Sequence, residues 1–348
     1  LIRIIKEDCS TDISFRKNLA FEAFEKSSAY DFTISGYLNP ESSKNNSEIR
    51  ELRYGENPHQ KGRFIGDLKD FLIQLNGKEI SYNNLLDIDA SLDLLRDLES
   101  NKAVFLIHKH NNPCGVAIRD SIVEAYEDAL ACDNISAFGG VLTSNKKIDK
   151  KTADQINKLF FEILIAPDFD DDSLDLLKSK KNRIIIKLNK IPKKSIQKRS
   201  CLNGFLEQDI DNKIENFGDF KVVTTKTPNI KNSNDLVLAS IIAKHTKSNC
   251  IAIVKNQQLI GSGMGQVSRI DALDQAIEKS KRFGFELDQS CLASDAFFPF
   301  SDCVEISFKN GIDSIVQPGG SVRDQDSIDF CNKNQMSMVF SGIRHFRH

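Results

Sequence analysis

Short apolar runs alternate with helical patterns from about residue 50 to the end of the chain. The run at 103–107 (AVFLI) is continuous, which is typical of a strand buried on both faces. A helix is predicted near 121–131, where Ser121 and Glu124 form a capping-box pattern. Further strands are predicted at 183–188, 250–255, 303–308, 313–317 and 336–340, and further helices after Lys151 and near 235–246 and 270–282. This alternation predicts an α/β fold with a largely parallel or mixed sheet.

The flanking and linking segments have a different character. Residues 11–38 carry Phe15, Leu19 and Ala23 at a spacing of four, which predicts a helix. Residues 39–49 are polar and contain proline, so we expect a loop or linker there. Residues 178–199 hold ten Lys or Arg without interleaved aromatic residues, which favours a solvated loop over a nucleic-acid surface and predicts a domain boundary near residue 195.

The bulk composition excludes several classes of protein. A formal net charge of -2 gives no general attraction to nucleic acid or anionic membranes. No apolar run reaches the roughly 18 residues of a membrane helix, and no signal-peptide pattern is present. The eight cysteines include no C-x-x-C pair, which indicates reduced, buried thiols rather than structural zinc. We therefore predict a cytoplasmic globular protein.

Residues 109–115 (KHNNPCG) carry the most informative chemistry of the chain, because they directly follow the apolar run at 103–107. Lys109 can stabilise negative charge, and His110 can move a proton near neutral pH. The Asn-Pro dipeptide and the following glycine predict a turn. A strand end of this kind is where an α/β sheet presents side chains to a ligand, so the segment indicates an enzyme.

Further clusters carry groups suited to anionic or heterocyclic ligands, although each also has a structural interpretation. Residues 52–60 could form a polar turn, 136–140 a helix cap, 293–300 core packing and 342–348 a frayed basic tail. Phe346, which stands between charged residues, favours a docked tail instead. Residues 317–321 could form a backbone anion nest. The glycines of 261–265 only superficially match a dinucleotide fingerprint, and we expect them to form a turn that sets Asn249 and Arg269 toward a common pocket.

Taken in order, these motifs closely resemble one family, the formyltransferase half of the bifunctional purine-biosynthesis enzyme. That half is aminoimidazole carboxamide ribonucleotide (AICAR) transformylase. The resemblance covers residues 50–348, while 11–38 look like the end of the family's cyclohydrolase domain, most of which we expect to be absent. It implies a helical remnant and linker (1–49) and two cytidine-deaminase-like three-layer subdomains with mixed sheets (50–195 and 196–348). It also implies a homodimer with interfacial active sites, and we expect no cyclohydrolase activity.

The implied reaction moves a formyl group from 10-formyltetrahydrofolate to AICAR, without a redox cofactor or catalytic metal. By resemblance, His110 is the general base, Lys109 stabilises the transition state and Asn249 is a second polar contact. The implied AICAR-binding residues are Arg53, Tyr54, Gly139, Glu162, Arg269, Phe297 and Arg344. The implied folate-binding residues are Ile270, Phe298, Pro299, Phe300, Asp302, Ser321 and Val322. Met264 departs from the pattern, because we expect a small residue between the glycines.

Two other functions stay open at this point. A metal-dependent deaminase would share the implied fold, but it needs a Pro-Cys-x-x-Cys element, and Pro113-Cys114 has no second cysteine. A purine- or folate-binding regulatory module would need Arg53, Arg344 and the Phe cluster, but neither Lys109 nor His110.

Overall fold

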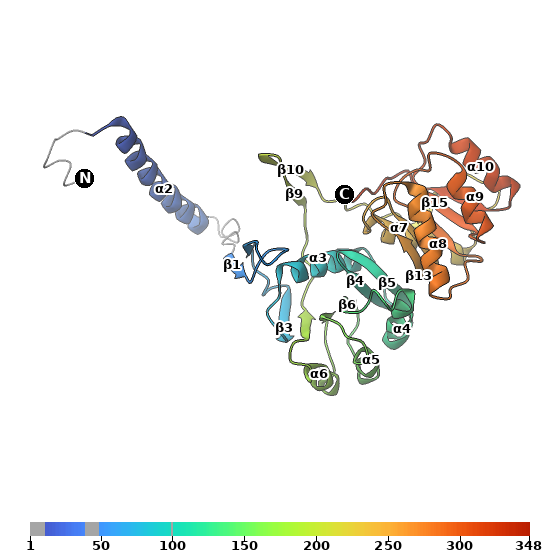
Figure 1. Cartoon of the computed structure of the whole chain (residues 1–348), viewed down its shortest axis with the longest axis horizontal. Helices are drawn as coiled ribbons and strands as arrows, with labels where there is room; N and C mark the ends of the chain where they lie inside the picture. Colours follow the sequence, from blue (N-terminus) through green and yellow to red (C-terminus); the bar gives the residue numbers. More distant parts are fainter. Residues whose placement is uncertain (1–10, 39–48, 99) are drawn as a thin grey trace.

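A 12-stranded mixed sheet runs through the body of the protein (Figure 1). The computed structural model describes residues 11–38, 49–98 and 100–348. The strands of this sheet are β3 (Leu72–Asn76), β4 (Ala103–Lys109), β5 (Asn112–Arg119), β6 (Val141–Ser144), β7 (Ile163–Ala166), β8 (Ile184–Leu188), β11 (Lys221–Val222), β12 (Ile251–Lys255), β13 (Gln258–Gly263), β14 (Cys291–Ser294), β15 (Ser314–Gln317) and β16 (Ser337–Phe340). Their order in space is β11-β16-β15-β14-β12-β13-β5-β4-β6-β7-β8-β3.

The helices and the smaller sheets complete the described part of the chain. The helices are α2 (Ile13–Leu38), α3 (Tyr82–Asp97), α4 (Ile122–Cys132), α5 (Lys150–Ile156), α6 (Asp171–Lys178), α7 (Ile230–Lys244), α8 (Arg269–Arg282), α9 (Asp302–Lys309) and α10 (Asp324–Lys333), with a 3-10 turn η2 (Phe217–Asp219). Two antiparallel hairpins are formed by β1 (Ile49–Leu52) with β2 (Gly62–Ile65), and by β9 (Ile196–Cys201) with β10 (Gly204–Asp209). The β9–β10 hairpin projects from the body, and all its strand residues are exposed (Figure 1).

The sheet is built from two copies of one arrangement. The order helix, strand, strand, helix, strand, helix, strand, helix, strand occurs first from α3 to β8 and again from α7 to β16. The two halves meet where β5 and β13 pair antiparallel through Ala117 and Gln258. The predicted α/β fold with a mixed sheet is therefore confirmed, and the two halves share one continuous sheet.

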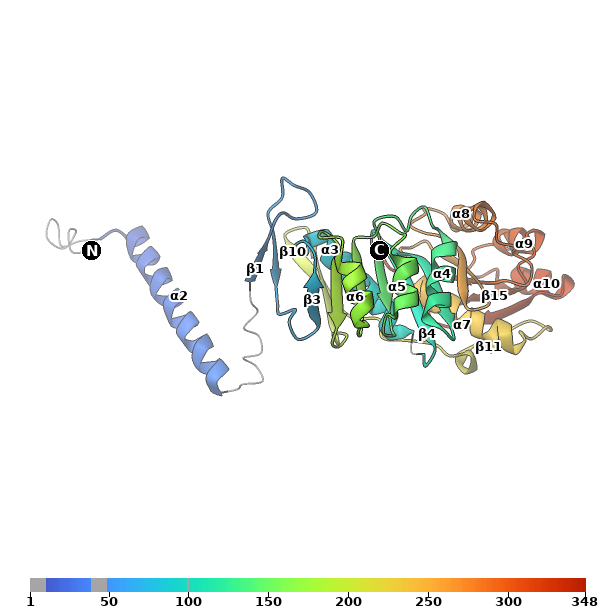
Figure 2. The same ribbon diagram turned by 90° about the horizontal axis from the view of Figure 1, so that it is seen from below.

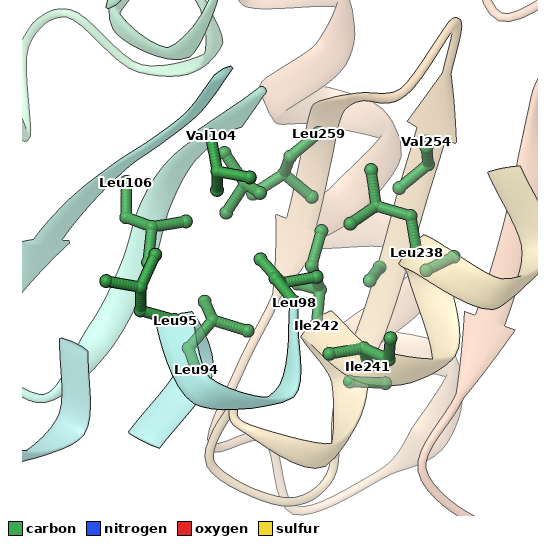
Figure 3. Close-up of a cluster of buried hydrophobic side chains, with 14 of the residues drawn as sticks. Leu94, Leu95, Leu98, Val104, Leu106, Leu238, Ile241, Ile242, Val254 and Leu259 are labelled. Atoms are coloured by element: carbon green, nitrogen blue, oxygen red, sulfur yellow. The ribbon is translucent and has the colours of Figure 1, made fainter. Parts of the chain in front are cut away.

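Helices cover both faces of the sheet, which gives three layers. Helices α4, α5 and α6 pack side by side on one face of the first half (Figure 2), and α8, α9 and α10 cover the same side of the second half. Helices α3 and α7 cover the opposite face. Under them a single apolar cluster crosses from one half to the other, and Leu98, just after the end of α3, lies beside Ile242 of α7 (Figure 3).

A buried polar contact also joins the two halves behind this cluster. The Lys244 Nζ and the His245 Nε2 each lie 2.8 Å from Asp97 Oδ2. Burial opposes the charge on Asp97, but the bonds to His245 and Lys244 outweigh it and hold the pKa of Asp97 well below its ordinary value. The contact fixes the end of α3 against the end of α7.

Strand directions place many chain segments along one edge of the sheet. The β4 strand is antiparallel to β6, and β6 is parallel to β7. The strand pairing continues from β4 through β5 and β13 to β12. It places the beginning of β12 and the ends of β14, β15 and β16 at the same edge of the sheet as the end of β4. We call this the common edge, and it is the edge at which Lys109 ends β4.

Four local predictions are wrong. The glycines of 261–265 do not form the predicted turn as a group, because Gly261 and Gly263 belong to β13. Residues 303–308 are helical rather than a strand, because Cys303 and Ser307 share the buried face of α9 at a spacing of four. Residues 178–199 are not a loop throughout, because they contain the beginning of β9 and the buried strand β8, which confirms the separate strand prediction at 183–188. The Asn-Pro dipeptide forms no turn, because Asn112 and Pro113 already belong to β5.

Other predictions are confirmed, with small shifts in their ends. The helix at 11–38 is present as α2, and the helix predicted near 235–246 begins at Ile230 because Asn229 caps it. The predicted linker at 39–49 lies almost entirely outside the described residues. Six of the seven cysteines in the described part of the chain are buried, and burial raises the pKa of Cys114 to about 12. None of the described helices is both long and apolar enough to span a membrane.

Candidate active site

A two-residue turn between β4 and β5 presents the predicted catalytic pair at the common edge. His110 and Asn111 both have left-handed backbones, with φ of 50° and 62°, as the tight turns of β-hairpins require. Asp87 of α3 accepts a hydrogen bond from the Asn111 backbone N–H at 2.7 Å. Asn112 Oδ1 accepts one from the Lys247 N–H at 3.2 Å. The turn is therefore held both by α3 and by the second half of the protein, while the His110 side chain stays exposed.

A pocket of about 480 Å³ opens beside this turn. Six of the residues predicted from the sequence lie in its wall, namely Arg53, Tyr54, Lys109, His110, Gly139 and Glu162. Its other lining residues come chiefly from the segment before α3 and from the first turns of α3. The pocket thus combines cationic and acidic groups with an imidazole and a phenol.

Lys109 is held by backbone oxygens at the pocket wall. Its Nζ donates to the Phe138 carbonyl at 3.0 Å and to the Gly139 carbonyl at 2.9 Å. An ammonium group has three N–H donors, so one is left for a ligand. Gly139 has a φ of +68°, and a Cβ atom there would lie 3.0 Å from the Lys109 Nζ. Glycine at this position therefore lets the backbone approach the lysine closely.

Glu162 stands just before β7 in the same pocket, and its backbone N–H donates to the Gly140 carbonyl at 3.1 Å. Its Oε2 accepts a hydrogen bond from Asn84 Nδ2 at 3.0 Å and lies 3.7 Å from Lys78 Nζ. Asn84 is itself fixed near the beginning of α3, where Ser81 caps the helix. The Asn84 bond occupies one of the four acceptor positions of the carboxylate, which leaves Glu162 able to accept from a ligand N–H.

Asp87 and Asn84 are site residues that the sequence predictions missed. Burial raises the pKa of Asp87 above its ordinary value, although the Asn111 N–H and the charges of His110 and Lys109 act in the opposite direction. Both residues are polar and stand at a spacing of three on the inner face of α3. That pattern, polar residues within an otherwise apolar helical face, is the sequence signal that could have indicated them.

Arg53 and Tyr54 enter the pocket from the segment between β1 and β2. The Arg53 guanidinium lies 5.6 Å from the centre of the Tyr54 ring. No carboxylate of the described residues forms an ion pair with Arg53. An exposed guanidinium without such a partner is suited to a phosphate monoester.

Asn249 and Arg269 lie in the second half of the protein, also at the common edge, and they contact each other. Arg269 Nη2 donates to Asn249 Oδ1 at 2.8 Å, and its Nη1 pairs with Asp295. Asn249 Nδ2 donates to the Gln266 carbonyl at 2.8 Å. The Arg269 guanidinium and the Asn249 amide thus already have hydrogen-bond partners within the chain. Gly263 serves packing, because a Cβ atom there would lie 1.8 Å from the Ala272 carbonyl oxygen of α8.

The predicted folate-binding residues, and the neighbouring Phe297 that was predicted to bind AICAR, differ widely in exposure. Phe298 is 0% exposed and belongs to the core under α8 and α9, whereas Phe297 and Phe300 are 38% and 52% exposed. Pro299 and Val322 are exposed, while Ile270, Asp302 and Ser321 are half-buried. The backbone N–H groups of Gly320 and Ser321 donate to Asp324 Oδ2 at 2.7 and 3.1 Å. The predicted anion nest is therefore filled by a carboxylate of the same chain.

The C-terminal segment is docked, as predicted. His345 lies between two carboxylates, with Nδ1 2.6 Å from Asp211 Oδ2 and Nε2 3.0 Å from Glu215 Oε1. Burial disfavours the charged ring, but these two partners outweigh it and raise the pKa of His345 to about 9. Arg347 Nη1 donates to the His245 carbonyl at 2.7 Å. Arg344 stays exposed and stacks over Phe346, with 4.4 Å between the guanidinium carbon and the ring centre.

No three His, Cys, Asp or Glu side chains converge as metal ligands in the part of the chain that the structure describes. Cys114 is buried, and its Sγ donates to the Ile107 carbonyl at 3.4 Å. A thiol with a raised pKa and this hydrogen bond is a packing group rather than a nucleophile.

Comparisons with known proteins agree with the motifs. Residues 1–279 match the protein family described as the AICARFT/IMPCHase bienzyme. The bifunctional purine biosynthesis protein PurH of Bacteroides thetaiotaomicron is 51% identical over 353 residues, covering 99% of this chain and 68% of that protein. The proteins of the same name from Caldicellulosiruptor saccharolyticus and Acetivibrio thermocellus are 43% and 42% identical, covering 100% and 98% of this chain and 70% and 69% of theirs.

Proposed function

This chain belongs to the AICARFT/IMPCHase bienzyme family, and from that premise we propose that it transfers a formyl group from 10-formyltetrahydrofolate to the 5-amino group of AICAR. The products are formyl-AICAR and tetrahydrofolate, and the reaction is a step in the synthesis of inosine monophosphate. The observation that carries the proposal is that Lys109 and His110 share one pocket with Arg53, Tyr54 and Glu162. Of the family's two activities, only the formyl transfer is proposed for this chain.

His110 acts as the general base of the reaction. The 5-amino group of AICAR is a weak nucleophile, because its lone pair is delocalised into the imidazole and carboxamide. Attack on the formyl carbon therefore requires that the amine proton leave as the C–N bond forms. The His110 ring supports this role because it is exposed at the pocket rim and is held on a tight, hydrogen-bonded turn.

Lys109 stabilises the negative charge that develops on the formyl oxygen. The Phe138 and Gly139 carbonyls fix its ammonium group before the substrate arrives, so little reorganisation is needed during the reaction. The remaining N–H donor can point to the oxyanion. As the tetrahedral intermediate collapses, the folate nitrogen must accept a proton, and either Lys109 or the protonated His110 can supply it.

Binding of AICAR is assigned to the polar wall of the pocket. Arg53 suits the phosphate, Tyr54 offers a flat face to the heterocycle, and Glu162 can accept from the carboxamide N–H₂. The exposed face of Phe297 suits AICAR and that of Phe300 suits an aromatic ring of the folate, whereas Phe298 could contribute only through its backbone.

We further propose that two copies of the chain form a homodimer with shared sites. The predicted residues divide into two groups, one around the pocket of the first half and one around Asn249, Arg269 and Arg344 in the second. Both groups face the common edge. A second copy placed against that edge would bring the Arg344 group of one protomer to the pocket of its partner. The division into 1–49, 50–195 and 196–348 and a cytoplasmic location stay part of the proposal, and the boundary at 195 coincides with the beginning of β9.

The test is a formyl-transfer assay with purified protein, AICAR and 10-formyltetrahydrofolate, in which formyl-AICAR is identified by mass. Turnover that requires both substrates supports the proposal. Tight binding of AICAR without turnover would instead support the regulatory module, and a stoichiometric zinc ion with deamination of a nucleoside would support the deaminase.

The shared site has its own test, which is complementation between inactive variants. His110→Ala removes the proposed base from the pocket group, and Arg344→Ala removes a proposed AICAR contact from the other group. If each site uses both protomers, mixing the two variants restores activity in the heterodimer at the one site that carries both wild-type groups. Absence of any recovery after subunit exchange would contradict shared sites.

A further inference from the structure

The internal duplication of the fold extends to the polar residues around the catalytic turn. Asp87 is the sixth residue of α3, and Asp235 is the sixth residue of α7. Each helix packs against the hairpin that follows it in the chain, α3 against β4–β5 and α7 against β12–β13. The two aspartates therefore occupy equivalent places in the two halves.

Both aspartates make the same kind of contact. Asp87 Oδ1 accepts from the backbone N–H of Asn111 at 2.7 Å. Asp235 accepts from the backbone N–H groups of Asn256 and Gln257 at 2.8 and 2.7 Å. Asn256 and Gln257 form the two-residue turn of their hairpin, with left-handed φ of 55° and 57°. In each half, one carboxylate thus holds a left-handed turn from the helix packed beneath it.

Neighbouring contacts are duplicated as well, which shows that the equivalence is not confined to one pair. Asn84 bonds to Glu162 at the beginning of β7, and Asn232 bonds to Asp313 at the beginning of β15. Lys78 Nζ lies 3.7 Å from Glu162 Oε2, and Lys226 forms an ion pair with Asp313. The last residue before the turn is a lysine in both halves, Lys109 and Lys255.

The clear difference lies in the first residue of the turn. It is His110 in the first half and Asn256 in the second. Because the second turn carries no titratable side chain but keeps its aspartate, the shared contact serves the geometry of the turn rather than proton transfer.

We propose that Asp87 is a positioning residue, which acts through the backbone of Asn111 to hold Lys109 and His110 in their reactive arrangement. The proposal rests on the formyl transfer proposed above. A left-handed backbone is costly for histidine and asparagine and persists only where neighbouring groups hold it. The bond from Asp87 joins this turn to α3, which also carries Asn84, the hydrogen-bond partner of Glu162. One helix thereby fixes the distance between the catalytic pair and Glu162.

Two conservative variants separate the hydrogen bond from the charge. Asp87→Asn keeps an acceptor oxygen at the same reach but removes the charge. Asp87→Glu keeps the charge but carries the carboxylate one methylene farther, so it cannot hold the turn in the same place. We expect kcat of Asp87→Asn to stay within about threefold of wild type and kcat of Asp87→Glu to fall about 10- to 100-fold, since displacement of a reacting group by about 1 Å can cost that much.

The matched control is Asp235→Glu, which strains the equivalent turn in the other half. We expect it to lower thermal stability as Asp87→Glu does, while kcat stays near that of wild type. The KM for AICAR should change by less than about threefold in all variants, because none of them removes a proposed AICAR contact.

Several outcomes overturn the proposal. Higher turnover in Asp87→Glu than in Asp87→Asn would show that the charge matters and the turn bond does not. An equal loss of kcat in Asp235→Glu would show a general effect on the fold. Hydrogen exchange of the Asn111 amide gives a readout independent of turnover, and unchanged protection in Asp87→Glu would contradict the positioning role. Absence of turnover in wild type, by contrast, would contradict only the formyl transfer.

Discussion

Gly139→Ala is the substitution whose effect on the proposed site can be worked out most directly. The φ of Gly139 is +68°, and a new Cβ would lie 3.0 Å from the Lys109 Nζ. The left-handed backbone costs an alanine about 1 kcal/mol or somewhat more. Because 3.0 Å is short for a carbon–nitrogen contact, the ammonium must move by a few tenths of an ångström, away from the Phe138 and Gly139 carbonyls that hold it. We expect kcat for formyl transfer to fall about tenfold or more.

Gly284→Ala provides the control for backbone strain. Gly284 has a similar φ of +78°, and a Cβ there would meet no atom within 4 Å. Both variants should therefore lose about 1–2 kcal/mol of unfolding free energy, measured by urea denaturation. Only Gly139→Ala should lose turnover. If the two variants had equal kcat, the close approach of Gly139 to Lys109 would have no part in the reaction, and the reasoning would be refuted.

The remaining predictions concern stability, pH and substrate binding. Asp211 and Glu215 outweigh burial and raise the pKa of His345 to about 9, so its contribution to stability is complete below pH 6.5 and is lost as pH rises through about 9. His345→Gln should flatten the alkaline decline of the unfolding free energy measured by urea titration between about pH 6 and 10. Burial lowers the pKa of His108 to about 3, so the unfolded chain binds a proton there that the folded chain does not, and stability falls below pH 6.5. His108→Leu should weaken that acid decline in the same titration. Gly263→Ala should cost about 3 kcal/mol or more in the free energy of unfolding, because its Cβ would overlap the Ala272 carbonyl of α8. Arg53→Met should raise KM for AICAR about tenfold or more in the steady-state assay, with a smaller effect when the substrate lacks its phosphate.

Part of this fold could be predicted because its signals are local. The continuous apolar runs of β4, β8 and β12 and the caps of α4 and α8 lie within a few residues of the elements they define. Local patterns also explain the errors. In α9, β-branched residues alternating with polar ones favour a strand, but the helix forms because its buried face packs on the second half of the sheet.

The site is less accessible to sequence reasoning, because it depends on contacts between distant segments. The motif around Lys109 and His110 indicated chemistry, but the turn itself was placed two residues too late, since Asn-Pro is a stronger local turn signal than His-Asn. Asp87 acquires its role only when α3 packs beneath that turn. The aromatic run at 297–300 divides into buried and exposed members only when β14 and α9 are placed, so periodicity could not distinguish Phe298 from its neighbours.

The most direct test of the central claim is the turnover of His110→Ala with AICAR and 10-formyltetrahydrofolate at saturation, together with its Kd for AICAR. Loss of a general base costs about 10²- to 10⁴-fold in rate. We therefore predict that kcat falls by at least about 100-fold while the Kd stays within about threefold of wild type. Turnover within about tenfold of wild type would contradict the assignment of the Lys109–His110 turn as the centre of formyl transfer.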